Sequence, residues 1–130
     1  MEIKSGIDII EVDRVENSID EMGNKFINKI FTDEEIKYCK NTKKMQAQHF
    51  AARFAAKEAT FKAISTLLSD KYSISWKNIQ IINDEQGKPH IQIISIDNKV
   101  EKELSRIKSI DVSLSHIKEY AVASVSVIIN

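Results

Sequence analysis

Two acidic residues and one lysine stand in sequence contexts that are otherwise apolar. Glu58 and Lys62 are four residues apart in FAARFAAKEATFKA (residues 50–63), and Asp8 lies in the β-type run EIKSGIDII (residues 2–10). A partly buried carboxylate needs a cation nearby. Two carboxylates from different elements, together with a lysine, suit Mg²⁺ bound to a phosphate, because magnesium takes one or two carboxylates and keeps water and phosphate oxygens as its other ligands.

The position of Glu58 on its helix bears on whether this carboxylate belongs to a functional site or to an ordinary surface ion pair. At 100° per residue, Phe50, Phe54 and Phe61 share one stripe, alanines cover a second face, and Glu58 lies between the two. The plainer interpretation is an exposed Glu58–Lys62 ion pair that contributes about 0.3–0.5 kcal/mol. For Asp8, the plainer interpretation is that the strand ends and a turn begins there.

Composition limits the classes of function. The chain has 130 residues, enough for one domain, and its 19 basic and 19 acidic residues give a net charge of zero. We therefore expect neither nucleic acid nor a membrane surface as a partner, and any electrostatic recognition must use a local patch. Cys39 is the only cysteine, the N-terminus lacks a signal-type apolar run, and no apolar stretch approaches roughly 18 residues, so we expect a cytoplasmic protein.

Several common site motifs are absent from the sequence. It contains neither GxGxxG nor GxxxxGK[ST], so no glycine-rich phosphate loop of these types is present, and it contains no CxxC or HExxH that would indicate zinc. Of the three histidines, His116 follows a strand-type run directly before a turn. It could serve a site or be an ordinary surface group.

Hydrophobic periodicity and turn residues predict an α+β fold, with an antiparallel sheet packed with one long helix and shorter helices in a single domain over residues 1–130. Asp13 is expected to cap the first helix, Thr32 or Asp33 the third, and the turn EQGKP to join the first hairpin. The predicted strands are 2–10, 79–84, 90–96, 110–116 and 120–129, and the predicted helices are 14–22, 26–31, one that starts at 32 or 33, 44–68 and 97–107.

Five segments, taken in order, resemble the holo-[acyl-carrier-protein] synthases, the small phosphopantetheinyl transferases. Any one of the five would be weak evidence, but five in the same order and at suitable spacing are specific. The segments are GIDIIEVDR, IFTDEE, RFAAKEATFKA, NDEQGKP and VSLSHIKEYAVASV.

The resemblance implies an enzyme that moves the 4′-phosphopantetheine arm of coenzyme A onto a serine of apo acyl carrier protein and releases adenosine 3′,5′-bisphosphate. It also implies Mg²⁺ as cofactor, a role in fatty acid biosynthesis, and a homotrimer with sites at subunit interfaces. By the same resemblance, Asp8 and Glu58 ligate Mg²⁺, Glu58 and Lys62 are catalytic, and Lys62 meets the pyrophosphate. The other implied contacts are Gly87, Lys88, Pro89 and His116 to the coenzyme, and Arg14 to the carrier protein.

The chain departs from the family pattern at several positions. The family usually has glycine at positions 4 and 52, where this chain has Lys4 and Ala52, and serine where it has Phe61. The segment ISTLLSD also replaces a glycine-rich run whose N–H groups can bind phosphate. These departures keep two alternatives open: a non-catalytic oligomeric binding module of the same fold, and another Mg²⁺-dependent phosphoryl or nucleotidyl transferase.

Overall fold

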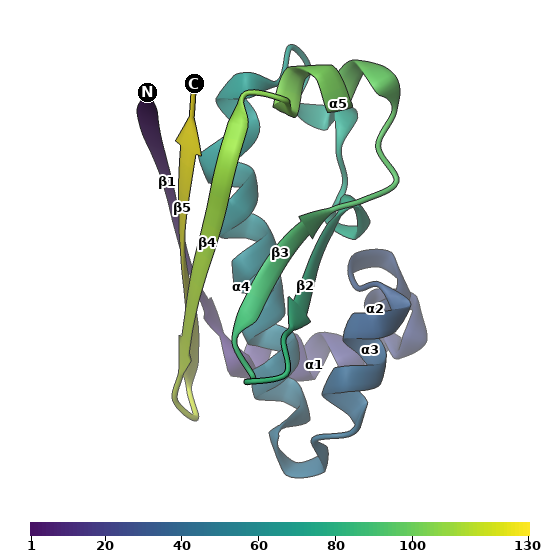
Figure 1. Ribbon diagram of the computed structural model, residues 1–130. Coiled ribbons are helices and arrows are strands. Elements are labelled where there is room, and N and C mark those ends of the chain that lie inside the picture. The colour runs from purple at the N-terminus through teal and green to yellow at the C-terminus, as the bar shows by residue number, and fades with distance from the viewer.

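One long helix, α4, lies between two antiparallel sheets. The computed structural model describes all 130 residues, and its element order is shown in Figure 1. No helix in it is both long enough and apolar enough to cross a membrane. The strands are β1 (Glu2–Glu11), β2 (Ile79–Asn83), β3 (Pro89–Ile93), β4 (Ile107–His116) and β5 (Tyr120–Ile129), and the helices are α1 (Val12–Met22), α2 (Asn24–Ile30), α3 (Asp33–Lys40), α4 (Gln46–Ile64) and α5 (Asn98–Leu104).

The larger sheet has the strand order β1-β5-β4, so the first strand of the chain pairs with the last. Asp8 pairs with Ala123 in the interior of β1, which continues to Glu11. The alternative in which the strand ends before Asp8 is therefore wrong. The smaller sheet is the hairpin β2–β3, which lies beside β4, and the two chain termini lie next to each other at one end of the large sheet (Figure 1).

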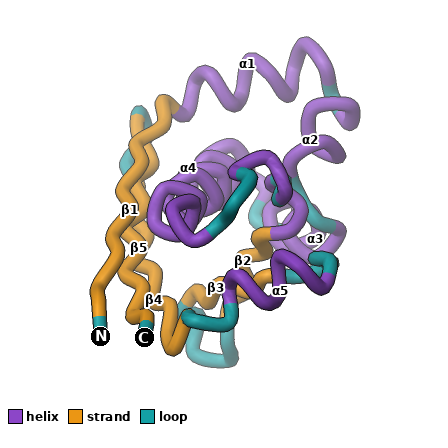
Figure 2. The backbone as a smooth tube through the Cα atoms, turned by 90° about the horizontal axis from the view of Figure 1, so that it is seen from above, coloured by secondary structure: helices purple, strands orange, loops and turns teal.

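Side chains alternate along β1 between the two faces of the sheet, and this alternation determines what faces α4. Gly6 and Asp8 point inward, whereas Ile3, Ile7 and Ile9 are exposed on the outer face. A Cβ atom at Gly6 would lie 1.8 Å from the carbonyl oxygen of Ala59, so only glycine lets β1 approach α4 this closely. Figure 2, which looks down on the molecule, shows α4 against β1 and β5 on one side and β2 and β3 on the other.

The alanine-rich face predicted for the long helix packs in two hydrophobic clusters. Ala55, Ala59 and Ala63 pack with the inward residues of β4 and β5. The N-terminal part of α4, including Phe50, packs with the short helices, where its ring centroid lies 4.8 Å from that of Phe31. The same rigid helix therefore joins both halves of the core.

A buried ion pair joins α3 to α4. Lys57 Nζ lies 2.7 Å from Glu35 Oε1, and both side chains are fully buried. Lys57 also donates hydrogen bonds to the carbonyl oxygens of Trp76 and Ile79, while Glu35 Oε2 accepts one from the N–H of Ile81. The pair ties α3 and α4 to the segment that leads into β2.

The α+β architecture, both hairpins and the Thr32 cap are as predicted; Thr32 and Glu35 form a reciprocal capping box. Asp13 as a cap is wrong. The helix begins at Val12 without a side-chain cap, because the Val12 N–H already donates to the carbonyl oxygen of Glu119. The long helix is shorter than the predicted 44–68, since one 3₁₀ turn precedes it and another, residues 65–67, follows it.

Candidate active site

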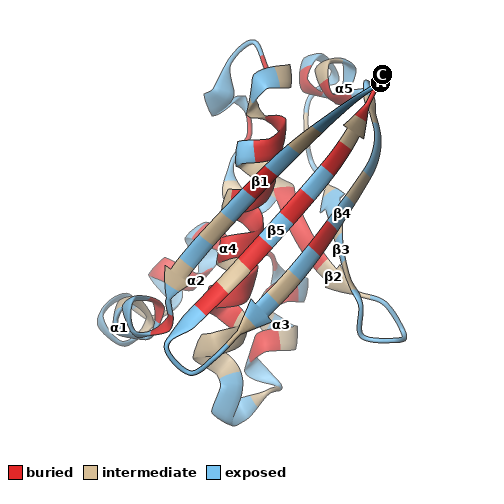
Figure 3. Ribbon diagram, turned by 90° about the vertical axis from the view of Figure 1, so that its left-hand side faces the viewer, coloured by how far each residue is buried: buried red, intermediate tan, exposed pale blue.

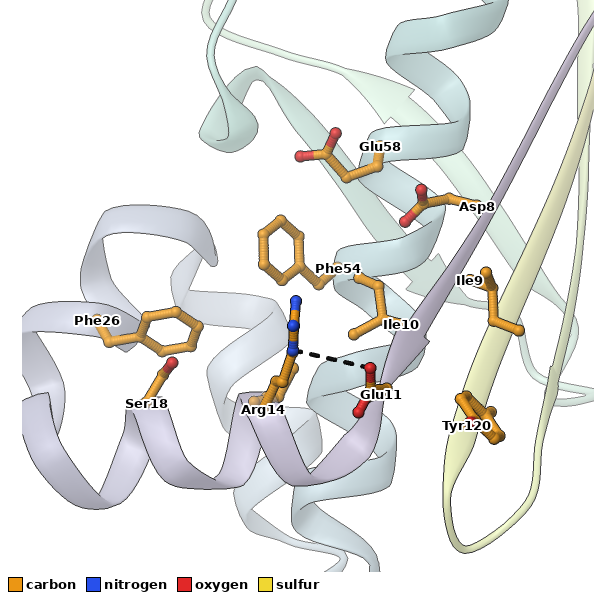
Figure 4. A pocket seen from close by; sticks show the side chains of 11 residues that line it. Asp8, Ile9, Ile10, Glu11, Arg14, Ser18, Phe26, Phe54, Glu58 and Tyr120 are labelled. Atoms are coloured by element: carbon orange, nitrogen blue, oxygen red, sulfur yellow. Dashed lines mark ion pairs between the residues drawn. The ribbon is translucent and has the colours of Figure 1, made fainter.

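A cavity of about 430 Å³ lies where β1 runs into α1, next to the middle of α4. Asp8 comes from β1, Arg14 from the first turn of α1 and Glu58 from α4, and Figure 4 shows all three side chains around this space. Phe26 and Phe54 form part of its wall. The cavity therefore combines acidic, basic and apolar groups that are far apart in the sequence.

Lys62 pairs with Asp8 rather than with Glu58. Its Nζ lies 3.1 Å from Asp8 Oδ1 and 3.0 Å from the carbonyl oxygen of Ile7. The Asp8 side chain is 17% exposed and that of Lys62 is 54% exposed. The i,i+4 pair with Glu58 is thus not formed, and an ammonium with three N–H donors keeps one free for a ligand.

Glu58 is held by a neutral donor. The indole Nε1–H of Trp76 donates to Glu58 Oε1 at 2.6 Å, and Glu58 Oε2 has no partner on the chain. The predicted intermediate burial of Glu58, between phenylalanines and alanines, is found. Trp76 could not be predicted from the sequence, since no spacing rule connects position 58 to a residue beyond the irregular segment 65–75.

The other residues assigned by resemblance gather at a different place. Gly87, Lys88, Pro89 and His116 line a second cavity of about 310 Å³, between the β2–β3 hairpin and β4. Gly87 has φ of +83°, a left-handed value that favours glycine in this turn. Within one chain this cavity shares no lining residue with the first one.

The second cavity also contains two basic residues of α4 that sequence analysis did not select. Arg53 is 3% exposed, lies 3.9 Å from the centre of the Tyr38 ring, and donates to Asn83 Oδ1 at 3.2 Å, while its Nε is buried without a partner. The His49 ring is 5.5 Å from that of His116. Burial, helped by the nearby charges of His116 and Arg53, lowers the pKa of His49. A spare buried donor and several basic groups suit an anionic ligand.

Three further ionisable groups lie outside both clusters or at their edge. Arg14 is 81% exposed and makes only a long ion pair, 3.8 Å, with Glu11. His90 contacts Asp84 at 2.8 Å on the hairpin. Cys39 is fully buried, and desolvation raises the pKa of its thiol to about 12, so it is no nucleophile.

The donor chemistry of the first cavity fits magnesium better than a soft metal. The structure gathers no cluster of three or more His, Cys, Asp or Glu side chains suited to a metal. Asp8 and Glu58 are two carboxylates on one cavity, and Glu58 Oε2 is open. Such a pair leaves most positions of an octahedron to water and phosphate, which is how Mg²⁺ is commonly bound at phosphate-transfer sites.

Comparison with known sequences connects this geometry to a family. Residues 4–125 match the sequence profile of the 4′-phosphopantetheinyl transferase superfamily. Holo-[acyl-carrier-protein] synthase from Ruminiclostridium cellulolyticum is 43% identical over 123 residues, 95% of this chain and 90% of that protein. The corresponding enzyme from Protochlamydia amoebophila is 41% identical over 123 residues, 95% of each chain.

Solved structures show the same fold. A crystal structure of Helicobacter pylori holo-[acyl-carrier-protein] synthase in complex with coenzyme A is similar with a TM-score of 0.78 and 28% identity, covering 95% of this chain and 99% of that one. The Bacillus anthracis enzyme in complex with CoA (3′,5′-ADP) gives a TM-score of 0.75 and 34% identity, covering 95% and 94%.

Proposed function

The chain belongs to the 4′-phosphopantetheinyl transferase superfamily, and we propose that it acts as a holo-[acyl-carrier-protein] synthase. It transfers the 4′-phosphopantetheine arm of coenzyme A to a serine of apo acyl carrier protein. The single observation that carries this function is the meeting of Asp8 and Glu58 at one cavity, with Lys62 bonded to Asp8, in a chain whose relatives have this activity. Residues 1–130 serve as one catalytic domain, and the product supplies fatty acid biosynthesis.

The transfer is a displacement at phosphorus. The serine oxygen forms a bond to the phosphorus that carries the pantetheine arm, the bridging P–O bond breaks, and adenosine 3′,5′-bisphosphate leaves with the electron pair. Lys62 places its free N–H at the pyrophosphate, where it stabilises the negative charge that develops on the leaving oxygen. The serine proton needs an acceptor, and Glu58, which lines the cavity and whose Oε2 has no partner on the chain, is a carboxylate that can take it.

Asp8 and Glu58 would hold Mg²⁺ in this site. When bound, the ion supplies Lewis-acid stabilisation of phosphate oxygens. Their different surroundings support this assignment: Asp8 is fixed by Lys62 and the strand ladder, and Glu58 is fixed by Trp76. Neither carboxylate therefore needs to be ordered when the substrate arrives, which lowers the cost of assembling the site.

The second cavity is proposed to bind another part of coenzyme A. Gly87, Lys88, Pro89 and His116 line it, together with the buried Arg53, and phosphate groups are the chemical class that these basic groups suit. Because the two cavities are separate within one chain, one coenzyme molecule would use the first cavity of one subunit and the second cavity of its neighbour. This arrangement requires an oligomer.

A homotrimer is the proposed assembly. The outer face of β1 exposes Ile3, Ile7 and Ile9, at 70%, 64% and 61%, on a sheet surface that no other element of the chain covers (Figure 3). Several exposed β-branched residues on one strand indicate a protein interface rather than a solvated surface. Closed cyclic symmetry would bury this face in each subunit and place the paired cavities at each interface.

Intact-mass analysis tests the function directly. The protein is incubated with coenzyme A, MgCl₂ and apo acyl carrier protein, and the carrier is expected to gain the mass of one phosphopantetheine group. Omission of coenzyme A or addition of EDTA should leave the carrier unmodified. No transfer by a folded protein, together with retained coenzyme binding, would instead support a binding module. Transfer of a nucleotidyl group would indicate a different transferase.

A further inference from the structure

Trp76 is the only tryptophan in the chain, and its one polar atom contacts Glu58. The Nε1···Oε1 distance of 2.6 Å is short even for a hydrogen bond to an ionised acceptor. The two residues are 18 positions apart and come from different elements, α4 and the 3₁₀ turn Trp76–Asn78. The contact is therefore a tertiary interaction, and it depends on the path of the segment between the two residues.

The backbone of Trp76 is also bound to α4, at the residue next to Glu58. Lys57, the neighbour of Glu58, donates from Nζ to the carbonyl oxygen of Trp76 at 2.8 Å. Adjacent residues of α4 thus bind the two ends of one tryptophan, its carbonyl and its ring. Because Lys57 is itself held by the buried carboxylate of Glu35, the anchor is part of the core.

The ring of Trp76 is also restrained by packing. It meets Phe54, one helical turn before Glu58, edge to face, with ring centroids 5.8 Å apart and planes at 88°. The Ser75 N–H donates to Asn78 Oδ1 at 2.8 Å, and the Asn78 N–H donates to the carbonyl oxygen of Ser75 at 3.0 Å, so the turn on which the tryptophan sits is fixed at both ends. The indole N–H has little freedom to point elsewhere.

We propose that Trp76 is a positioning residue that orients the Glu58 carboxylate for metal binding and transfer. The inference rests on the proposed function for the role of Glu58. The indole occupies Oε1 and leaves Oε2 without a partner on the chain, on a side chain that lines the cavity. An indole N–H is a donor only and carries no charge. It therefore fixes the carboxylate without neutralising its charge.

The substitution Trp76→Phe tests this role, because it keeps an aromatic ring against Phe54 and removes only the donor and one ring. We expect kcat to fall about tenfold, which corresponds to an activation barrier that is higher by about 1.4 kcal/mol. The MgCl₂ concentration for half-maximal activity should rise by about as much, while KM for coenzyme A stays within about twofold. Circular dichroism of both proteins checks that the variant is folded.

Tyr72→Phe is the matched control. Tyr72 lies in the same irregular segment, is 82% exposed, and its hydroxyl has no partner on the chain. The control should keep wild-type kcat and magnesium dependence. If Trp76→Phe behaved like Tyr72→Phe in both quantities, the positioning role would be excluded.

The fluorescence of the single tryptophan gives a readout that does not depend on turnover. Titration of the wild-type protein with MgCl₂ in the presence of coenzyme A should change the emission of Trp76, because the charge beside its indole is altered. Glu58→Gln should change the emission of the metal-free protein and abolish the response to magnesium. If neither Glu58→Gln nor MgCl₂ changed the fluorescence emission of Trp76, the inference would be overturned.

The two readouts separate this inference from the proposed function. A wild-type protein that transfers no arm, yet shows the magnesium-dependent emission change and its loss in Glu58→Gln, would refute the function and leave the orientation of Glu58 by Trp76 intact. A wild-type protein that transfers the arm, with a Trp76→Phe variant equal to the control, would refute the positioning role alone.

Discussion

At the scale of single residues, the two carboxylates of the cavity are restrained by opposite kinds of partner. Asp8 forms an ion pair with the ammonium group of Lys62, whereas Glu58 accepts only a hydrogen bond from the neutral indole of Trp76. The negative charge of Glu58 is thus the less compensated of the two. This makes Glu58 the stronger candidate to attract a cation.

The first prediction concerns these carboxylates. Glu58→Gln and Asp8→Asn keep the side-chain shape and remove the charge, so each should lower transfer activity by a factor of at least about 10³, as expected when an essential group of a phosphoryl-transfer site is lost. Ser18→Ala, in the same cavity but without a hydrogen-bond partner on the chain, is the control. The ligand role of Glu58 would be wrong if Glu58→Gln retained a tenth of wild-type kcat.

The second prediction concerns Arg14 and the carrier protein. Arg14 is 81% exposed at the rim of the cavity, so it can reach a bound partner without rearrangement. Arg14→Ala should raise KM for acyl carrier protein severalfold, leave KM for coenzyme A unchanged, and flatten the loss of carrier affinity with added salt. Steady-state kinetics at several salt concentrations measure this. Equal changes for both substrates would contradict a docking role.

The third prediction follows from the lowered pKa of His49. In the unfolded chain the imidazole takes up a proton near its usual value of 6.5, whereas in the folded protein burial, His116 and Arg53 hold its pKa below that value. As the pH falls through 6.5 the unfolded state binds more protons, so stability is lost until the folded pKa is reached. The thermal midpoint of the ligand-free protein should therefore fall between about pH 7.5 and about pH 5.5. His49→Gln should make the slope shallower; an identical slope would contradict the assignment.

At the scale of elements, hydrophobic periodicity was sufficient to predict the regular strands and helices. It could not predict the polar contacts between residues that are far apart in the sequence. The β-type run at residues 2–10 predicted the strand that carries Asp8, and the helical wheel predicted Glu58 between the phenylalanine stripe and the alanine face; both are confirmed. The Lys57–Glu35 pair and the Trp76–Glu58 bond were not predictable, because each joins residues whose separation depends on how irregular segments cross. The Asp13 cap failed for the same reason, since a carbonyl from the distant β4–β5 turn takes its place.

The fourth prediction tests the buried ion pair that holds α3, α4 and β2 together. Lys57→Met leaves the fully buried Glu35 carboxylate without its cation, and should lower the free energy of unfolding by about 3–5 kcal/mol. The double variant Lys57→Met with Glu35→Gln has no buried charge left and should recover part of this loss. Urea unfolding followed by circular dichroism measures both. A double variant as unstable as the sum of the single variants would show that charge compensation is not the cause.

At the scale of the whole molecule, one face of the large sheet is covered by the rest of the chain and the other face is exposed. Its inner face packs on α4, while its outer face combines the exposed isoleucines of β1 with serines of β4 and β5 (Figure 3). A monomer with this surface would expose apolar area without a function. The proposed trimer would use it and would bring the two cavities of different subunits together.

The fifth prediction tests that assembly. Ile7→Lys puts a charge in the centre of the exposed face of β1 and should shift the mass measured by light scattering from three subunits to one, with loss of transfer activity. Met22→Lys is the control, because Met22 is also an exposed apolar residue, at 48%, but lies at the end of α1 away from the sheet. A wild-type protein that is a stable, active 14.8 kDa monomer would rule out the trimer and the shared coenzyme site.

The pairing of β1 with β5 also has a consequence for how the chain reaches its active form. Glu2 pairs with Ile129 and Asp8 with Ala123, so the ladder that holds Asp8 closes a loop of more than a hundred residues. Contacts this far apart in sequence slow folding, because the entropy of loop closure is lost before the contacts form. During synthesis at the ribosome, α4 and its Glu58 emerge long before β5 does. Because β5 is the only strand that pairs with β1, the ladder that holds Asp8 can form only after residues 120–129 have been synthesised.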